Sequence, residues 1–220
     1  MNRVEIKNKA KEMIKGNKWF IWKPLIIIGL ILAVIEGIAF GLDTAFGLTK
    51  EVTYELFGTT TKYTTGGIIT NIVSIFTGIV GSAFYVGYAY YLLSFVRGKK
   101  LEMKDIFDFM KKYWVIAFLV GLLTGLCILV GMILLVIPGI IAAIGLMFYR
   151  EVCADHPEMK ATELVKKAWA MTKGHKMDLF VMGLSFFGWI LLAPLTFGIL
   201  YIWLMPYMLV AFTLTYEELK

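Results

Sequence analysis

Long apolar stretches alternate with short lysine-rich segments along the chain. These stretches approach the roughly 20 residues that a helix needs to cross the hydrocarbon layer of a membrane. We therefore predict transmembrane helices over residues 24–46, 67–96, 113–136, 139–154, 179–197 and 199–216. The first stretch exceeds the apolar core of a secretory signal and no A-x-A cleavage site follows it, so we expect it to be retained. The sequence Val136-Ile137-Pro138-Gly139 predicts a tight turn between the third and fourth helices.

The polar segments between these stretches have a pattern of their own. In each of three segments the apolar residues recur with the period of an α-helix, which predicts amphipathic helices over residues 1–18, 99–112 and 157–174. We expect each to lie in the cytoplasmic interface and to be followed by a transmembrane hairpin. Residues 9–18 and 167–176 share the pattern K-A-x-x-M-x-K-G-x-K, which indicates an internal repeat. Gly16 and Gly174 are predicted to end two of these surface helices.

The composition supports a membrane protein. Hydrophobic residues make up 59% of the 220 residues and charged residues 17%, against about 45 to 50% and about 25% in soluble proteins. We therefore predict an all-α fold, a polytopic bundle of about six transmembrane helices that forms a single membrane domain over residues 1–220.

The basic residues predict the orientation of the bundle. They gather in the three surface segments, which alternate loops would place on one side, and the positive-inside rule makes that side the cytoplasm. Both termini are therefore predicted to be cytoplasmic. The net charge of +6 could suggest nucleic acid, but basic residues beside membrane spans more commonly contact lipid headgroups. We expect nine lysines to contact anionic lipid headgroups, a membrane protein partner or a second copy of the chain. The alternative is that they form a solvated charged face. The nine are Lys11, Lys15, Lys18, Lys111, Lys112, Lys166, Lys167, Lys173 and Lys176.

One acidic residue falls inside an apolar stretch. Glu36 lies near the middle of the first predicted span, and ionisable groups at that depth are candidates for function. The alternative is a protonated side chain that is hydrogen-bonded to a hydroxyl such as Ser82, Tyr85 or Thr124. Along the second span, small and polar residues recur on one stripe that is either a packing seam or a polar pathway: Asn71, Ser74, Gly78, Gly81, Tyr85 and Tyr88. Together with Glu36, we take Asn71, Ser74, Ser82 and Tyr85 as a candidate intramembrane polar site.

Small residues predict how the spans pack. Helices in lipid approach one another through residues that allow close backbone contact. A ridge in the first span repeats every fourth residue, and shorter sets occur in the second and third spans: Gly29, Ala33, Gly37 and Gly41, then Ser74, Gly78 and Ser82, then Gly121 and Gly125. We expect a tight bundle from these faces.

Catalytic chemistry has no clear signature in this sequence. No nucleophile with a base, no paired carboxylates and no phosphate-binding loop can be recognised. The closest set, Cys153-Ala154-Asp155-His156, lacks the second ligand cluster of a zinc site, and its Asp155 suits the start of the third surface helix. Cys127 and Cys153 are expected at different depths, so a disulfide is not predicted. We predict no metal, no cofactor and no enzymatic activity.

Several strings in the second half of the chain resemble one known family. They are Ile137-Pro138-Gly139-Ile140-Ile141, Asp155-His156-Pro157, Met171-Thr172-Lys173-Gly174-His175-Lys176, Leu184-Ser185-Phe186-Phe187-Gly188-Trp189, Thr196-Phe197-Gly198-Ile199 and Trp203-Leu204-Met205-Pro206-Tyr207. In order and spacing they are similar to the bacterial integral-membrane family catalogued as domain of unknown function 975, although His156 and His175 stand where we expect Asn. The resemblance implies a multi-span protein of the bacterial cell membrane, and it supplies no activity or catalytic residues.

Three functions are compatible with these patterns. The first is a non-enzymatic module that binds lipid or a partner through its basic surface helices, in envelope maintenance or protection. The second is a small transporter or channel that uses Glu36 and the polar stripe of the second span. The third is an accessory lipid-modifying protein, for which the sequence offers no catalytic group.

Overall fold

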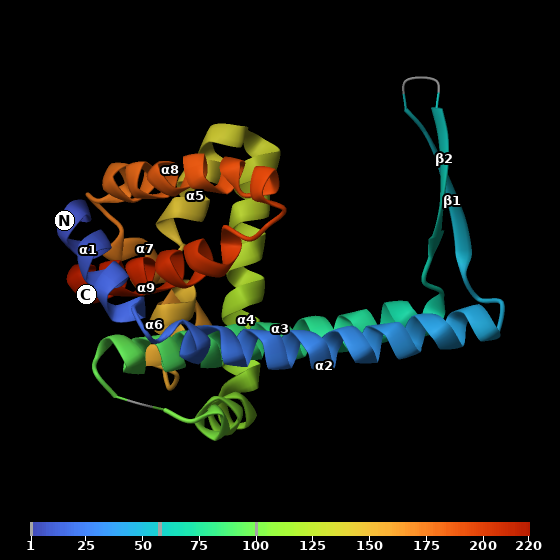
Figure 1. The fold of residues 1–220 in the computed structure, drawn as a ribbon, viewed down its shortest axis with the longest axis horizontal. Helices are drawn as coiled ribbons and strands as arrows, with labels where there is room; N and C mark the ends of the chain where they lie inside the picture. Colours follow the sequence, from blue (N-terminus) through green and yellow to red (C-terminus); the bar gives the residue numbers. More distant parts are fainter. Residues whose placement is uncertain (1, 57–58, 100) are drawn as a thin grey trace. The chain divides into compact units, whose positions relative to one another are not determined.

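The computed structural model describes residues 2–56, 59–99 and 101–220. Over these residues the chain is predominantly helical, which confirms the predicted fold class (Figure 1). Met1 and Lys100, which fall within the predicted surface helices 1–18 and 99–112, lie outside the described residues. The chain divides into two compact units, residues 23–81 and a larger unit of residues 1–22 and 82–220.

The smaller unit consists of two helical segments joined by a β-hairpin. Helix α2 (Lys18–Ala45) enters it at Lys23, and helix α3 (Ile68–Val96) leaves it at Gly81. Strands β1 (Lys50–Leu56) and β2 (Thr59–Thr65) pair in antiparallel register between them. The hairpin was not predicted, although its threonine, valine and tyrosine residues are ones that favour strands. Tyr54 and Tyr63 pack edge to face across it, with ring centroids 5.7 Å apart.

Four consecutive helices form the core of the larger unit. These are α4 (Met103–Leu134), α5 (Val136–Gly145), α6 (Tyr149–Asp155) and α7 (Ala161–Met171). Helix α4 contacts the other three, and fully buried side chains from three of the helices meet in one apolar cluster that includes Val120, Val152 and Leu164.

Two features of α4 and α5 were not expected from the sequence. The backbone of α4 leaves the helical conformation at Tyr113, with φ −121° and ψ 15°. The predicted turn at Val136-Ile137-Pro138-Gly139 is wrong, because Leu135 alone separates the two helices and Val136 begins α5. Pro138 is tolerated there because the first turn of a helix has no acceptors for its backbone N–H groups.

The remaining helices are α1 (Arg3–Ile14), α8 (Lys176–Leu192) and α9 (Tyr201–Leu219), with a short 3₁₀ turn, η1 (Pro194–Thr196), before α9. Helix α1 packs on α9 and buries three apolar residues, Ile6, Ala10 and Ile14. Gly16 follows the last residues of α1 with φ +85°, a left-handed conformation that favours glycine. Gly16 therefore ends the helix as predicted.

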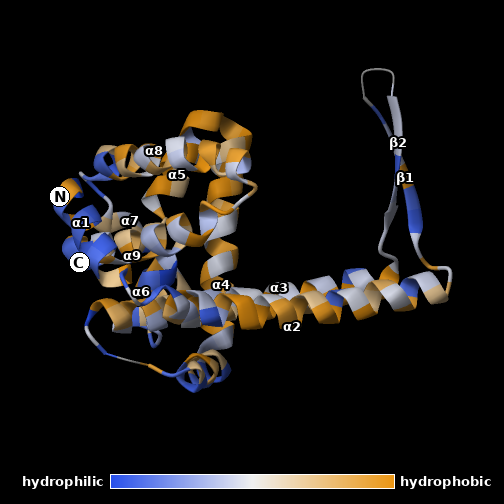
Figure 2. Cartoon of the chain, viewed as in Figure 1, coloured by the Kyte–Doolittle hydropathy of each residue, from blue (hydrophilic) through white to orange (hydrophobic). Residues whose placement is uncertain are grey.

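Five helices among the described residues are long and apolar enough to cross a membrane. They are Lys18–Ala45, Ile68–Val96, Met103–Leu134, Val136–Asp155 and Lys176–Thr196, of which the fourth combines α5 with α6 and the fifth combines α8 with η1. The last predicted span, residues 199–216, forms α9, which is not one of the five. Apolar residues run along much of the length of these helices (Figure 2), and many large apolar side chains are exposed, as lipid-facing surfaces require.

The close contacts predicted at the glycines of these ridges are not found among the described residues. At Gly29, Gly37, Gly41 and Gly78 of the smaller unit, an added Cβ would meet no atom of the described residues within 4 Å, and the same holds for Gly121 and Gly125 of the larger unit. Close approaches occur at other glycines instead. A Cβ added at Gly131 would lie 3.0 Å from the Gly139 Cα, and a Cβ added at Gly145 would lie 2.5 Å from the Trp169 ring. Periodic spacing alone does not identify which face of a helix is packed.

Candidate functional site: a cavity at Glu151 and three polar clusters

A cavity of about 330 Å³ in the larger unit is lined by side chains of four helices. Leu92 comes from α3, Glu151 from α6 and Ile190 from α8, and α9 supplies the remaining six lining residues: Tyr201, Met205, Met208, Leu209, Phe212 and Thr213. Most of this lining is apolar. Tyr201 and Met205 are 40% and 38% exposed, so the cavity opens to the surroundings on their side.

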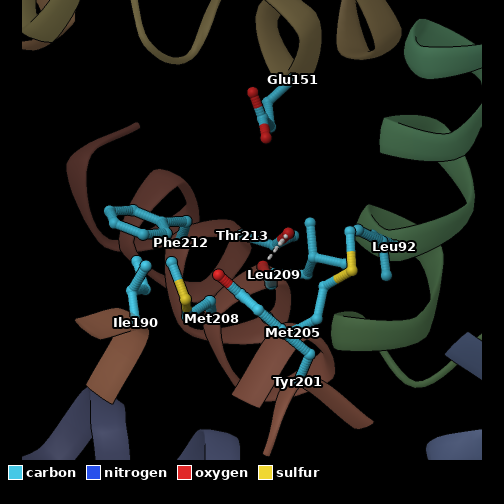
Figure 3. A pocket seen from close by; sticks show the side chains of 9 residues that line it. All are labelled: Leu92, Glu151, Ile190, Tyr201, Met205, Met208, Leu209, Phe212 and Thr213. Carbon is cyan, nitrogen blue, oxygen red and sulfur yellow. Dashed lines mark hydrogen bonds between the residues drawn. The ribbon is translucent and has the colours of Figure 1, made fainter. Parts of the chain in front are cut away.

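Glu151 is the one charged residue that lines this cavity. It lies in the first turn of α6, after the break between α5 and α6 at residues 146–148. Its carboxylate points from α6 into the cavity, toward α9 (Figure 3). The Oε2 atom is buried and has no hydrogen-bond partner among the described residues. Thr213 does not satisfy it, because the Thr213 hydroxyl donates to the Leu209 carbonyl at 2.9 Å.

Burying a carboxylate oxygen without a partner is costly, and native proteins do so rarely. Such an atom marks a place where a ligand or a proton completes the structure. We did not predict Glu151 from the sequence, because it follows Arg150 at the end of an apolar stretch and resembles an ordinary boundary charge. The signal that could have found it is a lone acidic residue followed directly by the apolar residues Val152 and Cys153.

A second cluster joins the ends of three helices in the larger unit. The Arg97 guanidinium donates to both carboxylate oxygens of Asp155, at 2.8 and 3.0 Å, and to Glu217 at 2.6 Å. Tyr216 donates to Asp155 at 3.0 Å and Lys220 also contacts this carboxylate. The hydrogen bonds to Asp155, and then those to Glu217, raise the pKa of Arg97 above its already high ordinary value. Asp155 therefore accepts hydrogen bonds from three residues of one ionic network. It does not begin α7, the helix predicted over residues 157–174, whose first residue is Ala161.

The predicted intramembrane acid, Glu36, lies in the smaller unit and is hydrogen-bonded. Its carboxylate accepts from the Ser74 hydroxyl at 2.9 Å and from the Thr77 hydroxyl at 2.5 Å. A hydroxyl partner was expected, with Ser82, Tyr85 and Thr124 as candidates, and the hydroxyls that donate to Glu36 within the smaller unit are those of Ser74 and Thr77. The structure thus brings Glu36 together with Ser74 and adds Thr77, which we did not predict.

The other residues of the predicted polar site have surroundings of their own. Asn71 donates to the Gly67 carbonyl of its own helix at 2.7 Å. Ser82 and Tyr85 belong to the larger unit. There the Tyr85 ring lies under the Arg150 guanidinium, 4.8 Å from the ring centroid. The stripe is therefore divided between the two units.

We expect Glu36→Gln to lower the stability of the protein only slightly, because the amide oxygen still accepts a hydroxyl. Glu36→Ala removes both hydrogen bonds and should cost about 1 kcal/mol, since such bonds in membranes average about 0.6 kcal/mol each. The measurement is unfolding in detergent, with a double-mutant cycle between Glu36→Ala and Ser74→Ala. A coupling energy of zero would show that the Glu36 to Ser74 bond does not form.

The predicted lysines all lie in the larger unit, with two kinds of surroundings. Six are exposed, namely Lys11, Lys15, Lys111, Lys112, Lys166 and Lys173. Three are half-buried: Lys18 lies over the Trp203 ring, Lys176 over the Trp169 ring, and Lys167 contacts His156. Contacts of this kind hold an ammonium group against an aromatic face.

Both thiols are free, and no group of His, Cys, Asp and Glu in the described part of the chain could hold a metal ion.

These features define a class of protein: a mainly helical chain with several helices that are compatible with crossing a membrane. Residues 125–220 match the model of the family described as protein of unknown function (DUF975), which confirms the family resemblance for this part of the chain. No curated protein and no solved structure matches the chain.

Proposed function

We propose that this protein is a non-enzymatic module of a bacterial cytoplasmic membrane that binds anionic lipid headgroups through lysines of its larger unit. In this arrangement both termini lie in the cytoplasm. The module serves the maintenance or protection of the envelope.

The distribution of charge between the two units carries this proposal. Only three of the 22 Lys and Arg residues fall in the smaller unit, at Lys23, Lys50 and Lys62. All the others fall in the larger unit, where exposed lysines lie on α1, α4 and α7 and in the turns that follow α1 and α7. Each Lys or Arg near an anionic membrane surface contributes about 1 kcal/mol to attraction. Clusters of such residues therefore favour phosphatidylglycerol over a zwitterionic lipid.

Removal of two exposed lysines tests this attraction. We expect Lys166→Gln together with Lys173→Gln to weaken binding of phosphatidylglycerol by roughly 30-fold, from about 1 kcal/mol for each lysine. The measurement is lipid binding to the purified, delipidated protein by native mass spectrometry, with phosphatidylcholine for comparison. Salt should weaken the binding of phosphatidylglycerol to the unaltered protein, because exposed charges are screened.

The matched control is the pair Lys50→Gln and Lys62→Gln on the hairpin, which removes the same charge from the smaller unit. This control should leave the affinity for phosphatidylglycerol unchanged. Equal losses in the two double variants would show that net charge and not the α7 region determines binding. Equal affinity of the unaltered protein for the two lipids would contradict the proposed function itself.

A further inference from the structure

The polar atoms that line the cavity at Glu151 are mainly hydrogen-bond acceptors. Glu151 Oε2 is unpartnered, and Thr213 has already given its only proton to the Leu209 carbonyl. Met205 and Met208 can only accept, and weakly. The Tyr201 hydroxyl can accept as well as donate. The lining residues include no Lys, Arg or His to neutralise the carboxylate.

A ligand that suits these acceptors is one that donates hydrogen bonds and carries positive charge. A primary ammonium group offers three N–H donors and a charge that compensates the Glu151 carboxylate. Phe212 and Tyr201 add aromatic side chains to the lining, and aromatic rings are compatible with a cation. An anion or a hydrogen-bond acceptor would instead meet like groups, so the lining discriminates against anionic lipid in the cavity itself.

The rest of the cavity selects the body of the ligand. Leu92, Ile190, Leu209 and the two methionines offer an apolar surface, and methionine adapts readily to different shapes. A volume of about 330 Å³ corresponds to about 11 water molecules at roughly 30 Å³ each, which is room for a small amphiphile. The opening beside Tyr201 and Met205 admits such a molecule.

We propose that this cavity binds an amphiphilic primary amine, whose ammonium group pairs with Glu151 and donates to the Thr213 hydroxyl oxygen while its apolar body packs against α9. This site is separate from the lysines of the proposed lipid-binding surface, and it prefers the opposite charge. Its ligand belongs to the class of small lipophilic amines, which includes membrane-active cationic compounds.

The test uses a pair of probes that differ only in the polar group. The full-length protein in phosphatidylcholine nanodiscs is titrated calorimetrically with phenylbutylamine and with phenylbutanol, each of about 11 non-hydrogen atoms, and empty nanodiscs supply the blank. We expect the amine to bind at least about tenfold more tightly than the alcohol, because a charge-assisted hydrogen bond is the stronger kind. Glu151→Gln should abolish this difference and leave the affinity for the alcohol unchanged.

Two further variants separate the site from general effects. Glu163→Gln removes an exposed carboxylate from α7 and should leave both affinities unchanged. Ile190→Phe fills the cavity from α8 and should weaken both probes. If Glu151→Gln does not fold, the affinities of the amine and the alcohol for the unaltered protein and for Ile190→Phe still test the proposal.

Equal affinities for the amine and the alcohol in the unaltered protein would overturn the proposal, as would amine binding that survives in both Glu151→Gln and Ile190→Phe. The lysine double variant Lys166→Gln and Lys173→Gln should bind the amine normally. Failure of the lipid experiment therefore leaves the amine experiment interpretable, and the reverse also holds.

Discussion

Arg97→Ala is expected to lower the free energy of unfolding by about 2 kcal/mol, between the losses measured for exposed and for buried ion pairs. The Asp155 side chain is only 10% exposed and receives two of its hydrogen bonds from Arg97. Without the guanidinium, Asp155 keeps Tyr216 and Lys220, but its main compensating charge is lost and Glu217 also loses its partner. The ends of α3, α6 and α9 are then no longer joined by one residue.

Arg97→Lys should also lower the free energy of unfolding, but by less than Arg97→Ala does. A lysine keeps the charge but cannot make the two parallel hydrogen bonds of a guanidinium to one carboxylate. Stability would be measured by unfolding in mixed micelles. The matched control is Arg3→Ala, whose partner Asp178 lies 3.9 Å away with both side chains about 40% exposed. Exposed pairs contribute about 1 kcal/mol or less, so equal losses at Arg97 and Arg3 would show that the network does not stabilise the larger unit.

The helical architecture could be predicted from the sequence because the length and apolarity of a helix are local properties. The stretch 67–96, for example, became α3 at Ile68–Val96. The β-hairpin was missed because its strands are short and mostly exposed, and therefore lack the alternation of buried and exposed residues that identifies a strand. Packing faces were also missed, since the glycines at close approaches, such as Gly67 and Gly131, follow no regular spacing.

The candidate sites were harder to predict because they depend on contacts between distant residues. Arg97 and Asp155 are 58 positions apart, and nothing in either local sequence identifies the other as its partner. Glu151 acquires its character only when α9 folds over it and leaves a cavity. Glu36 was recognised because a charge within an apolar stretch is a local anomaly, whereas the identity of its hydroxyl partners was not local.

The partners of Glu36 follow from a register that Asp43 sets in the smaller unit. Asp43 is buried and accepts hydrogen bonds from the backbone N–H groups of Gly67, Ile69 and Thr70 at the start of α3. Seven residues, about two helical turns, separate Glu36 from Asp43 along α2, and seven separate Gly67 from Ser74 along the chain. In antiparallel helices these intervals match, so the contact at Asp43 also brings Glu36 opposite Ser74.

Gly67→Ala should therefore disrupt more than one contact. A Cβ at this position would lie 2.3 Å from the Leu48 carbonyl oxygen and 2.8 Å from Asp43 Oδ1. The carbonyl belongs to the backbone and cannot move aside as a flexible side chain does, so the Asp43 contacts at the start of α3 must open. Overpacking typically costs roughly 1 to 3 kcal/mol, and we expect a loss of stability at the upper end of that range. We also expect trypsin to cleave faster at Lys50 and Lys62 on the hairpin.

Gly78→Ala provides the matched control in the same unit, within the helix that Gly67 directly precedes. A Cβ there meets no described atom within 4 Å, and alanine is favoured over glycine in a helix by about 1 kcal/mol. Gly78→Ala should accordingly leave stability unchanged or raise it, with tryptic cleavage of the hairpin unaltered. If both variants behaved alike, the contact between Asp43 and the start of α3 would not set the register of the two helices, and the pairing of Glu36 with Ser74 would need another cause.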